Sequence, residues 1–263
     1  MNRLVIDTST EAFSVAVISE SDKSDDNTEA ECQRHFEIAP RKHGELLLPT
    51  VDRLLQQANL TISDIDQVIY GRGPGAFTGI RIAISAAQGL AYGIDCPLVG
   101  ISSLQNLALQ AFDQTSADYA VVAMDARMGE IYYAIYRRNT ELLAGNCPEL
   151  IGEEQVLKPD TLLSLESQIK AFDSKKPSPK EAQPSKITAI GTGWSVYPDI
   201  LCQQLGVKPD VTLADKFPDA YYSGILARLV TLQATQHSAE QAVPVYLRNN
   251  VAAKSSKPSI LKR

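Results

Sequence analysis

Short apolar runs separated by polar turns open the chain and predict β-strands. Leu4–Ile6 leads into the polar turn Asp7–Thr10, and Phe13–Ile18 forms a second β-rich run. A third strand is expected near Cys32–Ile38, after an acidic stretch at residues 19–30 that we expect to be a solvated loop. The hairpin places the aspartate of the polar turn at the end of a strand.

Helical spacing then alternates with further strands. Leu46, Leu47, Val51, Leu54, Leu55 and Ala58 recur at the period of an amphipathic helix. The run Val68–Tyr70 predicts a short strand that enters the sequence GRGPG at residues 71–75, and a long helix is expected from Ala76 to Tyr92. Leu98–Ile101 and the stretch from Ser102 to Phe112 predict one more strand and helix.

The helix expected at residues 76–92 is apolar around nearly its whole circumference. Between Pro74 and Ile94 its only charged residue is Arg81, and small residues keep its surface smooth. Such a helix must be buried on most sides. A core helix under a sheet explains one face, whereas an interface with another chain explains the remaining faces. The residues alone leave both interpretations open.

A second unit repeats the opening pattern. Val121–Asp125, a turn and Ile131–Tyr136 follow the order of the first hairpin, and aligning Asp7 with Asp125 superposes Ala16 on Ala134 without a gap. Chance similarity between two hairpins is the alternative, but the repeat favours an internal duplication and two related α/β lobes. We expect a first lobe at 1–115 and a smaller second lobe at 116–218.

Three further segments complete the expected organisation. A closing helix at 220–235 is expected to pack back on a lobe, most simply the first. Residues 173–186 are rich in Lys, Pro and Ser and predict a flexible surface insertion. The last residues, 250–263, form a basic tail that is expected to be solvated.

Composition narrows the functional classes. With 263 residues and 44% apolar content the chain can build two modest cores. The net charge of −6 repels a phosphate backbone and argues against tight RNA binding by this chain alone. Four cysteines without a CxxC pair suggest neither a zinc knuckle nor a dithiol site. No signal peptide or long apolar run is found, so we expect a soluble, cytoplasmic protein with no membrane contact.

The candidate chemistry centres on the turn Asp7, Thr8, Ser9 and Thr10. Its hydroxyls and amides suit a phosphate, and its aspartate suits hydrated Mg²⁺. A complete nucleotide site would need a matching glycine-rich turn in the second lobe, where the chain has Arg127 and Met128. The GRGPG sequence lacks the lysine of a Walker loop, and histidines 35, 43 and 237 are too scattered for a triad. We therefore expect no catalytic residue, no metal and no cofactor, and interpret the turn as a vestigial phosphate site.

Five motifs resemble one family. Besides the VIDTST run at residues 5–10, the chain contains GRGPGAFTGIRIA at 71–83, MDARMGEIYYA at 124–134, GTGW at 191–194 and PVYLRN at 244–249. In this order they resemble the bacterial TsaB family, also called YeaZ, over nearly the whole chain. The resemblance implies the two-lobe α/β fold of actin, Hsp70 and sugar kinases.

The resemblance also implies a function. TsaB proteins are paralogues of TsaD, which transfers threonylcarbamoyl from its adenylate to adenosine 37 of transfer RNA (t6A formation), and TsaE, an ATPase, is the third component. The histidine pair by which TsaD holds a metal falls on Ser103 and Leu107, and its Gly-Gly turn falls on the segment 126–128. The resemblance thus implies a non-catalytic partner that forms a heterodimer with TsaD and meets tRNA only through the complex.

The same resemblance assigns the apolar helix to the interface, because TsaB and TsaD join through helices of their first lobes. The expected partner contacts are Leu47, Leu54, Phe77, Arg81, Ile84 and Gln88. The main alternative is an active ATP-dependent phosphotransferase of the same fold. A metalloprotease would need the missing histidine pair. A third alternative is a stand-alone homodimeric scaffold that uses the same helix against its own copy, and a homodimer in the absence of TsaD is compatible with the partnership as well.

Overall fold

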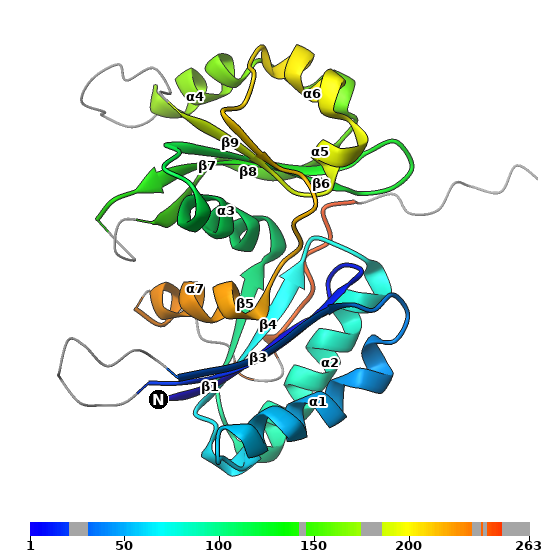
Figure 1. The fold of residues 1–263 in the computed structure, drawn as a ribbon, viewed down its shortest axis with the longest axis vertical. Coiled ribbons are helices and arrows are strands. Elements are labelled where there is room, and N and C mark those ends of the chain that lie inside the picture. Colours follow the sequence, from blue (N-terminus) through cyan, green and yellow to red (C-terminus); the bar gives the residue numbers. More distant parts are fainter. Residues whose placement is uncertain (21–30, 142–145, 175–185, 233–237, 239–240, 249–263) are drawn as a thin grey trace, which may run out of the picture.

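The computed structural model describes residues 1–263 except 21–30, 142–145, 175–185, 233–237, 239–240 and 249–263. Most of the expected loop at 19–30 and insertion at 173–186, and the whole tail 250–263, therefore lie outside the described residues. The chain forms two five-stranded sheets with helices outside and between them (Figure 1). From one end to the other, the layers are two helices, the first sheet, two central helices, the second sheet and three helices.

The first sheet has the order β3-β2-β1-β4-β5. Its strands are β1 (Asn2–Asp7), β2 (Ala12–Ser19), β3 (Glu31–Ile38), β4 (Gln67–Gly73) and β5 (Leu98–Ser102). β1 pairs antiparallel with β2 and parallel with β4, so it lies at the centre. The central strands are buried on both faces, which is why they read as continuous apolar runs and not as alternating ones.

The second sheet repeats this topology. Its strands are β6 (Tyr119–Asp125), β7 (Ile131–Asn139), β8 (Cys147–Leu157), β9 (Ile187–Ile190) and β10 (Val211–Leu213). β6 is central, antiparallel to β7 and parallel to β9, as β1 is to β2 and β4. The expected two-lobe α/β fold from duplicated units is confirmed. The boundary between residues 115 and 116 stays a prediction.

The ungapped alignment of the two hairpins is wrong by one residue. Val5 lies opposite Ala16 in the first hairpin, whereas its counterpart Ala123 lies opposite Tyr133 in the second. The structural counterpart of Ala16 is therefore Tyr133 and not Ala134. The reason is the turn, since the second hairpin closes with one residue fewer than the first.

The outer helices cover the sheets on their distant faces. α1 (His43–Gln57) and α2 (Phe77–Ile94) lie side by side below the first sheet in Figure 1, and a short 3-10 helix, Ile62–Asp64, precedes β4. α4 (Leu165–Asp173), α5 (Gly193–Val196) and α6 (Pro198–Leu205) cover the second sheet, where a 3-10 helix at Pro159–Thr161 follows β8. Within the described ranges, none of the helices has the length and apolarity that a membrane crossing requires.

Two helices fill the space between the sheets. α3 (Ser103–Gln114) packs on the second sheet through Leu104, Leu107, Ala108, Ala111 and Phe112. α7 (Ala220–Leu232) packs on the first sheet through Ala220, Leu226 and Ala227. The two helices also contact each other, so the lobes meet along the line between them.

Buried amides join α3 to the start of α7. Asn106 Nδ2 donates to the carbonyl of Asp219 at 2.8 Å and to Ser223 Oγ at 2.7 Å, while its Oδ1 accepts from the Asp219 N–H at 3.1 Å. Gln110 Nε2 donates to Asn106 Oδ1 at 2.9 Å and to the Phe217 carbonyl at 2.8 Å. Ser14 Oγ accepts from the N–H of Ala220 at 2.9 Å, which adds the first hairpin to the network.

Replacing Asn106 with alanine should destabilise the protein strongly. The change leaves the backbone carbonyl and the N–H of Asp219 without their hydrogen-bond partner, which costs roughly 2–4 kcal/mol. Urea unfolding at neutral pH measures the loss. Gln56→Ala, on the exposed side of α1, is the control and should change stability by less than about 0.5 kcal/mol. Equal effects of the two substitutions would contradict a structural role for the network.

Candidate functional site

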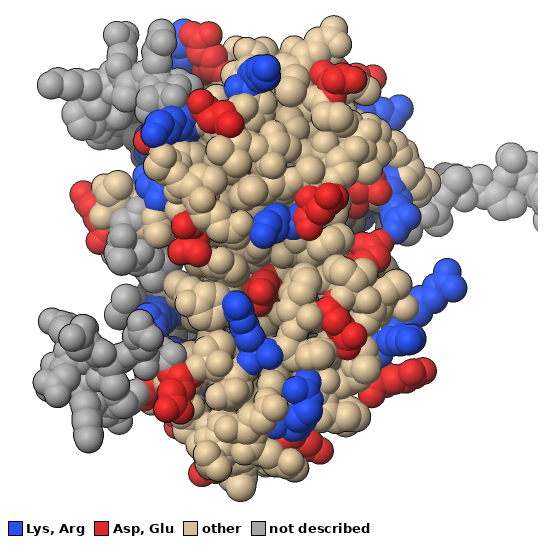
Figure 2. Space-filling model, viewed as in Figure 1, with Lys and Arg blue, Asp and Glu red and all other residues tan. Residues whose placement is uncertain are grey.

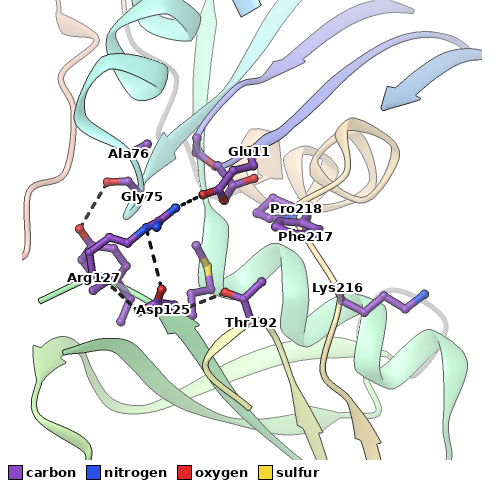
Figure 3. A pocket seen from close by; sticks show the side chains of 14 residues that line it. Glu11, Gly75, Ala76, Asp125, Arg127, Thr192, Lys216, Phe217 and Pro218 are labelled. Atoms are coloured by element: carbon purple, nitrogen blue, oxygen red, sulfur yellow. Dashed lines mark hydrogen bonds and ion pairs between the residues drawn. The ribbon is translucent and has the colours of Figure 1, made fainter. Parts of the chain in front are cut away.

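A cavity of about 80 Å³ lies where the two hairpin turns face each other across the lobes (Figure 3). It is lined by the first turn, the N-terminal end of α2, the second turn and the segments before α5 and α7. Sites for drug-sized ligands are generally about 300–1,000 Å³. The cavity between the lobes is thus several times smaller than a nucleotide requires.

The carboxyl of Asp7 is held inside the first lobe. Its Oδ1 accepts hydrogen bonds from the N–H of Ser9 at 2.9 Å and from Ser9 Oγ at 2.7 Å. Its Oδ2 is buried without a partner among the described residues, and Gly71 leaves so little room that an added Cβ would lie 2.3 Å from it. Burial raises the pKa of Asp7. This environment favours a neutral carboxyl and is poorly suited to a hydrated cation.

The other residues of the turn are turned toward α2. The N–H of Ala76 donates to the carbonyl of Ser9 at 2.7 Å, and Thr8 Oγ1 donates to the carbonyl of Gly79 at 2.7 Å. A Cβ added to Gly79 would lie 2.0 Å from the carbonyl oxygen of Thr8. The N-terminal end of α2, which could otherwise attract an anion, meets backbone carbonyls of the turn instead. Thr10 is the only other member of the turn, and it is also buried.

The second turn carries a cation across the mouth of the cavity. Arg127 has a φ of 62° and Met128 a φ of 58°, followed by Gly129 at 76°. The Arg127 guanidinium forms an ion pair with Glu11 of the first hairpin and lies 3.9 Å from Asp125 Oδ2 (Figure 3). Side chains thus occupy the position where a phosphate-binding turn would need glycine.

The positions that the resemblance aligned with a metal-binding histidine pair are both in the core. Ser103 Oγ donates to Ser9 Oγ at 3.0 Å, and both residues are fully buried. Leu107 packs under the second sheet and is also fully buried. No group of three or more His, Cys, Asp or Glu residues that could hold a metal ion occurs among the described residues. A hydroxyl and an isobutyl group do not fit a metal that needs two imidazoles.

Three of the six expected partner contacts were wrongly placed on the surface. Leu47, Leu54 and Ile84 are 3%, 0% and 5% exposed, and all belong to the core of the first lobe. Their side chains point from α1 and α2 toward the first sheet. Helical periodicity showed that they share faces with other apolar residues, and those faces are needed to cover their own sheet.

The other three expected contacts lie at one edge of α2, beside the C-terminal segment 241–248. Phe77 is 51% exposed and stacks on Tyr246 with ring centroids 5.5 Å apart. Arg81 Nε donates to the Tyr246 hydroxyl at 2.9 Å, and Gln88 Nε2 donates to the Ala242 carbonyl at 3.2 Å. The chain thus supplies its own partner along this edge.

A smooth face of α2 remains uncovered by the described residues. The face consists of the exposed residues Thr78, Ser85, Gly89 and Gly93 and the half-buried Ile82 and Ala86, with Tyr92 beside them at 78% exposed. We refer to these residues as the open face of α2. The sequence does not distinguish this face from the opposite one, because the buried residues Ala83, Ala87 and Ala91 are equally small.

Two glycines of α2 should respond oppositely to alanine. Gly79→Ala places a Cβ against the Thr8 carbonyl and should lower the free energy of unfolding by roughly 2–4 kcal/mol. Gly89→Ala meets nothing within 4 Å and should raise it by about 0.5–1 kcal/mol through helix propensity. Chemical denaturation of both variants tests the packing of the first turn on α2. A tolerated Gly79→Ala would show that the turn does not pack there in solution.

Asp7→Asn should remove a pH dependence. Because the folded protein binds the Asp7 proton more tightly than the unfolded chain does, wild-type stability falls as the pH rises from the ordinary aspartate range through the raised pKa. The amide oxygen still accepts from Ser9 but does not titrate. The stability difference, variant minus wild type, should therefore increase between about pH 3.5 and 7. Exposed Asp52→Asn is the control, and a difference for Asp7→Asn that stays constant with pH would refute the raised pKa.

Comparisons with known proteins identify the family to which the chain belongs. A family model described as TsaD, tRNA N6-adenosine threonylcarbamoyltransferase, matches residues 35–256. The chain is 36% identical over 259 residues to the tRNA threonylcarbamoyladenosine biosynthesis protein TsaB of Escherichia coli (strain K12), with 97% of each chain covered. It is 34% identical over 255 residues to the protein of the same description from Haemophilus influenzae, with 95% of each covered.

Two solved structures from Pseudomonas aeruginosa have the same fold. One is described as YeaZ and superposes with a TM-score of 0.74 at 34% identity, covering 94% of this chain and 99% of the other. The second, described as an uncharacterized protein with similarity to peptidase YEAZ, gives a TM-score of 0.75 at 35% identity with the same coverage. The resemblance inferred from the motifs is confirmed, and the chain belongs to the TsaB (YeaZ) family of tRNA threonylcarbamoyladenosine biosynthesis proteins.

Proposed function

We propose that this protein takes part in t6A formation on tRNA as the non-catalytic partner of TsaD, with TsaE as the third component. It acts by forming a heterodimer with TsaD through its first lobe, residues 1–115. The names of its relatives support the pathway, and the match to the TsaD family model supports a common fold for the two proposed partners. Since the substrate of the pathway is tRNA, we place the protein in the cytoplasm.

The open face of α2 carries the proposal. It is smooth, nearly uncharged and uncovered by the described residues, so a partner helix can approach its backbone closely. Tyr92 beside it is a large exposed aromatic of the kind that anchors protein interfaces. The expected contacts Phe77, Arg81 and Gln88 form one border of this face, together with segment 241–248.

The non-catalytic role rests on the cleft between the lobes. Its cavity is small, the turn Asp7–Thr10 faces α2, and the Arg127–Glu11 ion pair crosses the entrance. These contacts oppose the alternative of an ATP-dependent phosphotransferase. A peptidase activity, to which the description of one relative alludes, would need a nucleophile or metal that Ser103 and Leu107 do not supply.

Contact with tRNA is proposed to be indirect. Figure 2 shows basic and acidic side chains interspersed over one face of the described residues, without a continuous basic area. Arg127 and Arg248, which lie near the cleft, are each paired with a glutamate. With a net charge of −6, the protein offers a phosphate backbone little attraction.

Gly89→Glu should abolish the partnership without unfolding the protein. The position has open space around it, so the folded monomer accommodates the side chain, whereas a helix packed on the open face would have to bury an unpaired carboxylate. The measurement is t6A synthesis with purified TsaD, TsaE, the synthase that makes threonylcarbamoyl-adenylate, and tRNA, together with co-elution from TsaD. We expect at least about a hundredfold loss of affinity for TsaD.

The matched control is Ala171→Glu, which adds the same charge to an exposed position of α4 in the second lobe and should leave activity and co-elution unchanged. Ile84→Glu is not suitable, because Ile84 is in the core and its replacement would report on folding. The proposal fails if the wild-type protein is dispensable for t6A synthesis or turns over ATP alone. It also fails if Gly89→Glu binds TsaD as tightly as the wild-type protein does. If the protein forms a homodimer in the absence of TsaD and Gly89→Glu disrupts it, the homodimer and the heterodimer use the same face of α2.

A further inference from the structure

A second and larger cavity, of about 360 Å³, lies on another part of the seam between the lobes. Arg72 at the end of β4 and Gln105 in the first turn of α3 line it from one side. Tyr136 of β7 and Leu150, Gly152, Glu153 and Glu154 of β8 line it from the other. It shares no lining residue with the cavity between the hairpin turns. Its size is within the usual range of small-molecule sites.

The carboxylate of Glu154 is fixed at one wall of this cavity. The Tyr136 hydroxyl donates to Glu154 Oε1 at 2.7 Å, and Ser102 Oγ donates to the same oxygen. Ser102 is itself held as the N-cap of α3, where it accepts from the N–H groups of Leu104 and Gln105 at 3.2 and 3.3 Å. Burial, followed by the nearby glutamate, raises the pKa of Tyr136 well above its usual value, so the phenol remains a donor. Both hydroxyl hydrogen bonds hold the Glu154 carboxyl group at this wall.

An arginine with one buried, unpaired guanidinium nitrogen lines the same cavity. Arg72 Nε is buried and makes no hydrogen bond within the described part of the chain. In that same part, Arg72 and Glu154 form no ion pair, although both line the cavity. Buried polar groups in folded proteins almost always have a partner, and an exception is expected where a ligand or water supplies one. Two opposite charges, of which Glu154 is held by hydrogen bonds, therefore line one space without pairing with each other.

We propose that this cavity is a binding site for a free α-amino acid. The guanidinium of Arg72 receives the carboxylate, for which its planar fork is suited, and Glu154 receives the ammonium group. Gln105 adds an amide, and Leu150 lies beside the space left for the side chain. A free phosphate fits less well, since Glu153 and Glu154 would repel it. The ligand would contact both lobes and stabilise their arrangement, whether or not the protein binds TsaD.

The test is a screen of the twenty common L-amino acids against the full-length protein by ligand-observed NMR, followed by titration of any that bind. At least one should bind saturably. Its dissociation constant should rise by at least about tenfold in Arg72→Gln and in Glu154→Gln, which each remove one charge of the pair. Arg53→Gln, which removes an exposed arginine on α1, is the matched control and should bind like wild type.

The ligand itself provides a second test that needs no variant, in case one fails to fold. The methyl ester and the N-acetyl derivative of the bound amino acid each lack one of the two charges, and both should bind at least about tenfold more weakly. The proposal is overturned if no amino acid binds, if either derivative binds as tightly as the parent, or if Arg72→Gln folds and binds like wild type. The failure of this site would leave the proposed partnership with TsaD intact, because the t6A assay and Gly89→Glu measure that separately.

Discussion

The buried amides of Asn106 and Gln110 set the geometry on which the rest of the molecule depends. Both side chains are nearly inaccessible to solvent, and their hydrogen bonds hold the start of α7 against α3. Because α3 belongs to the core of the second sheet and α7 to that of the first, the network fixes the angle and distance between the lobes. Breaking it would leave buried polar groups without partners, so rotation of one lobe on the other is costly.

A fixed arrangement of the lobes explains the state of the cleft. The hairpin turn around Asp7 retains the hydroxyls and the carboxyl of a phosphate-binding turn, but its carbonyls are hydrogen-bonded or packed against the N-terminal end of α2. On the facing side, Arg127 reaches Glu11 and closes the space further. These contacts leave only a small cavity between the two turns.

The sequence predicted those parts of the fold that depend on local pattern. Apolar runs located β1, β2, β4, β5, β6 and β7, and the repeated aspartate turn indicated the duplication. The pattern did not predict β8 or α4–α6, because their exposed residues interrupt both periods. For the site, apolar character drew attention to α2, yet it could not show that Ile84 faces its own sheet. The contacts of Arg81 and Gln88 with residues more than 150 positions away were likewise beyond local reasoning.

The small residues of α2 have different roles on the two sides of the helix. On the inner side, Ala83, Ala87 and Ala91 let the helix lie close to the first sheet, which holds its backbone rigidly. On the open face, Ser85, Ala86 and Gly89 have little or no side-chain freedom to lose when they are covered. A partner that docks there therefore meets a surface already ordered by the core beneath it. For the proposed interface, the entropic cost of ordering side chains would then fall mainly on the partner.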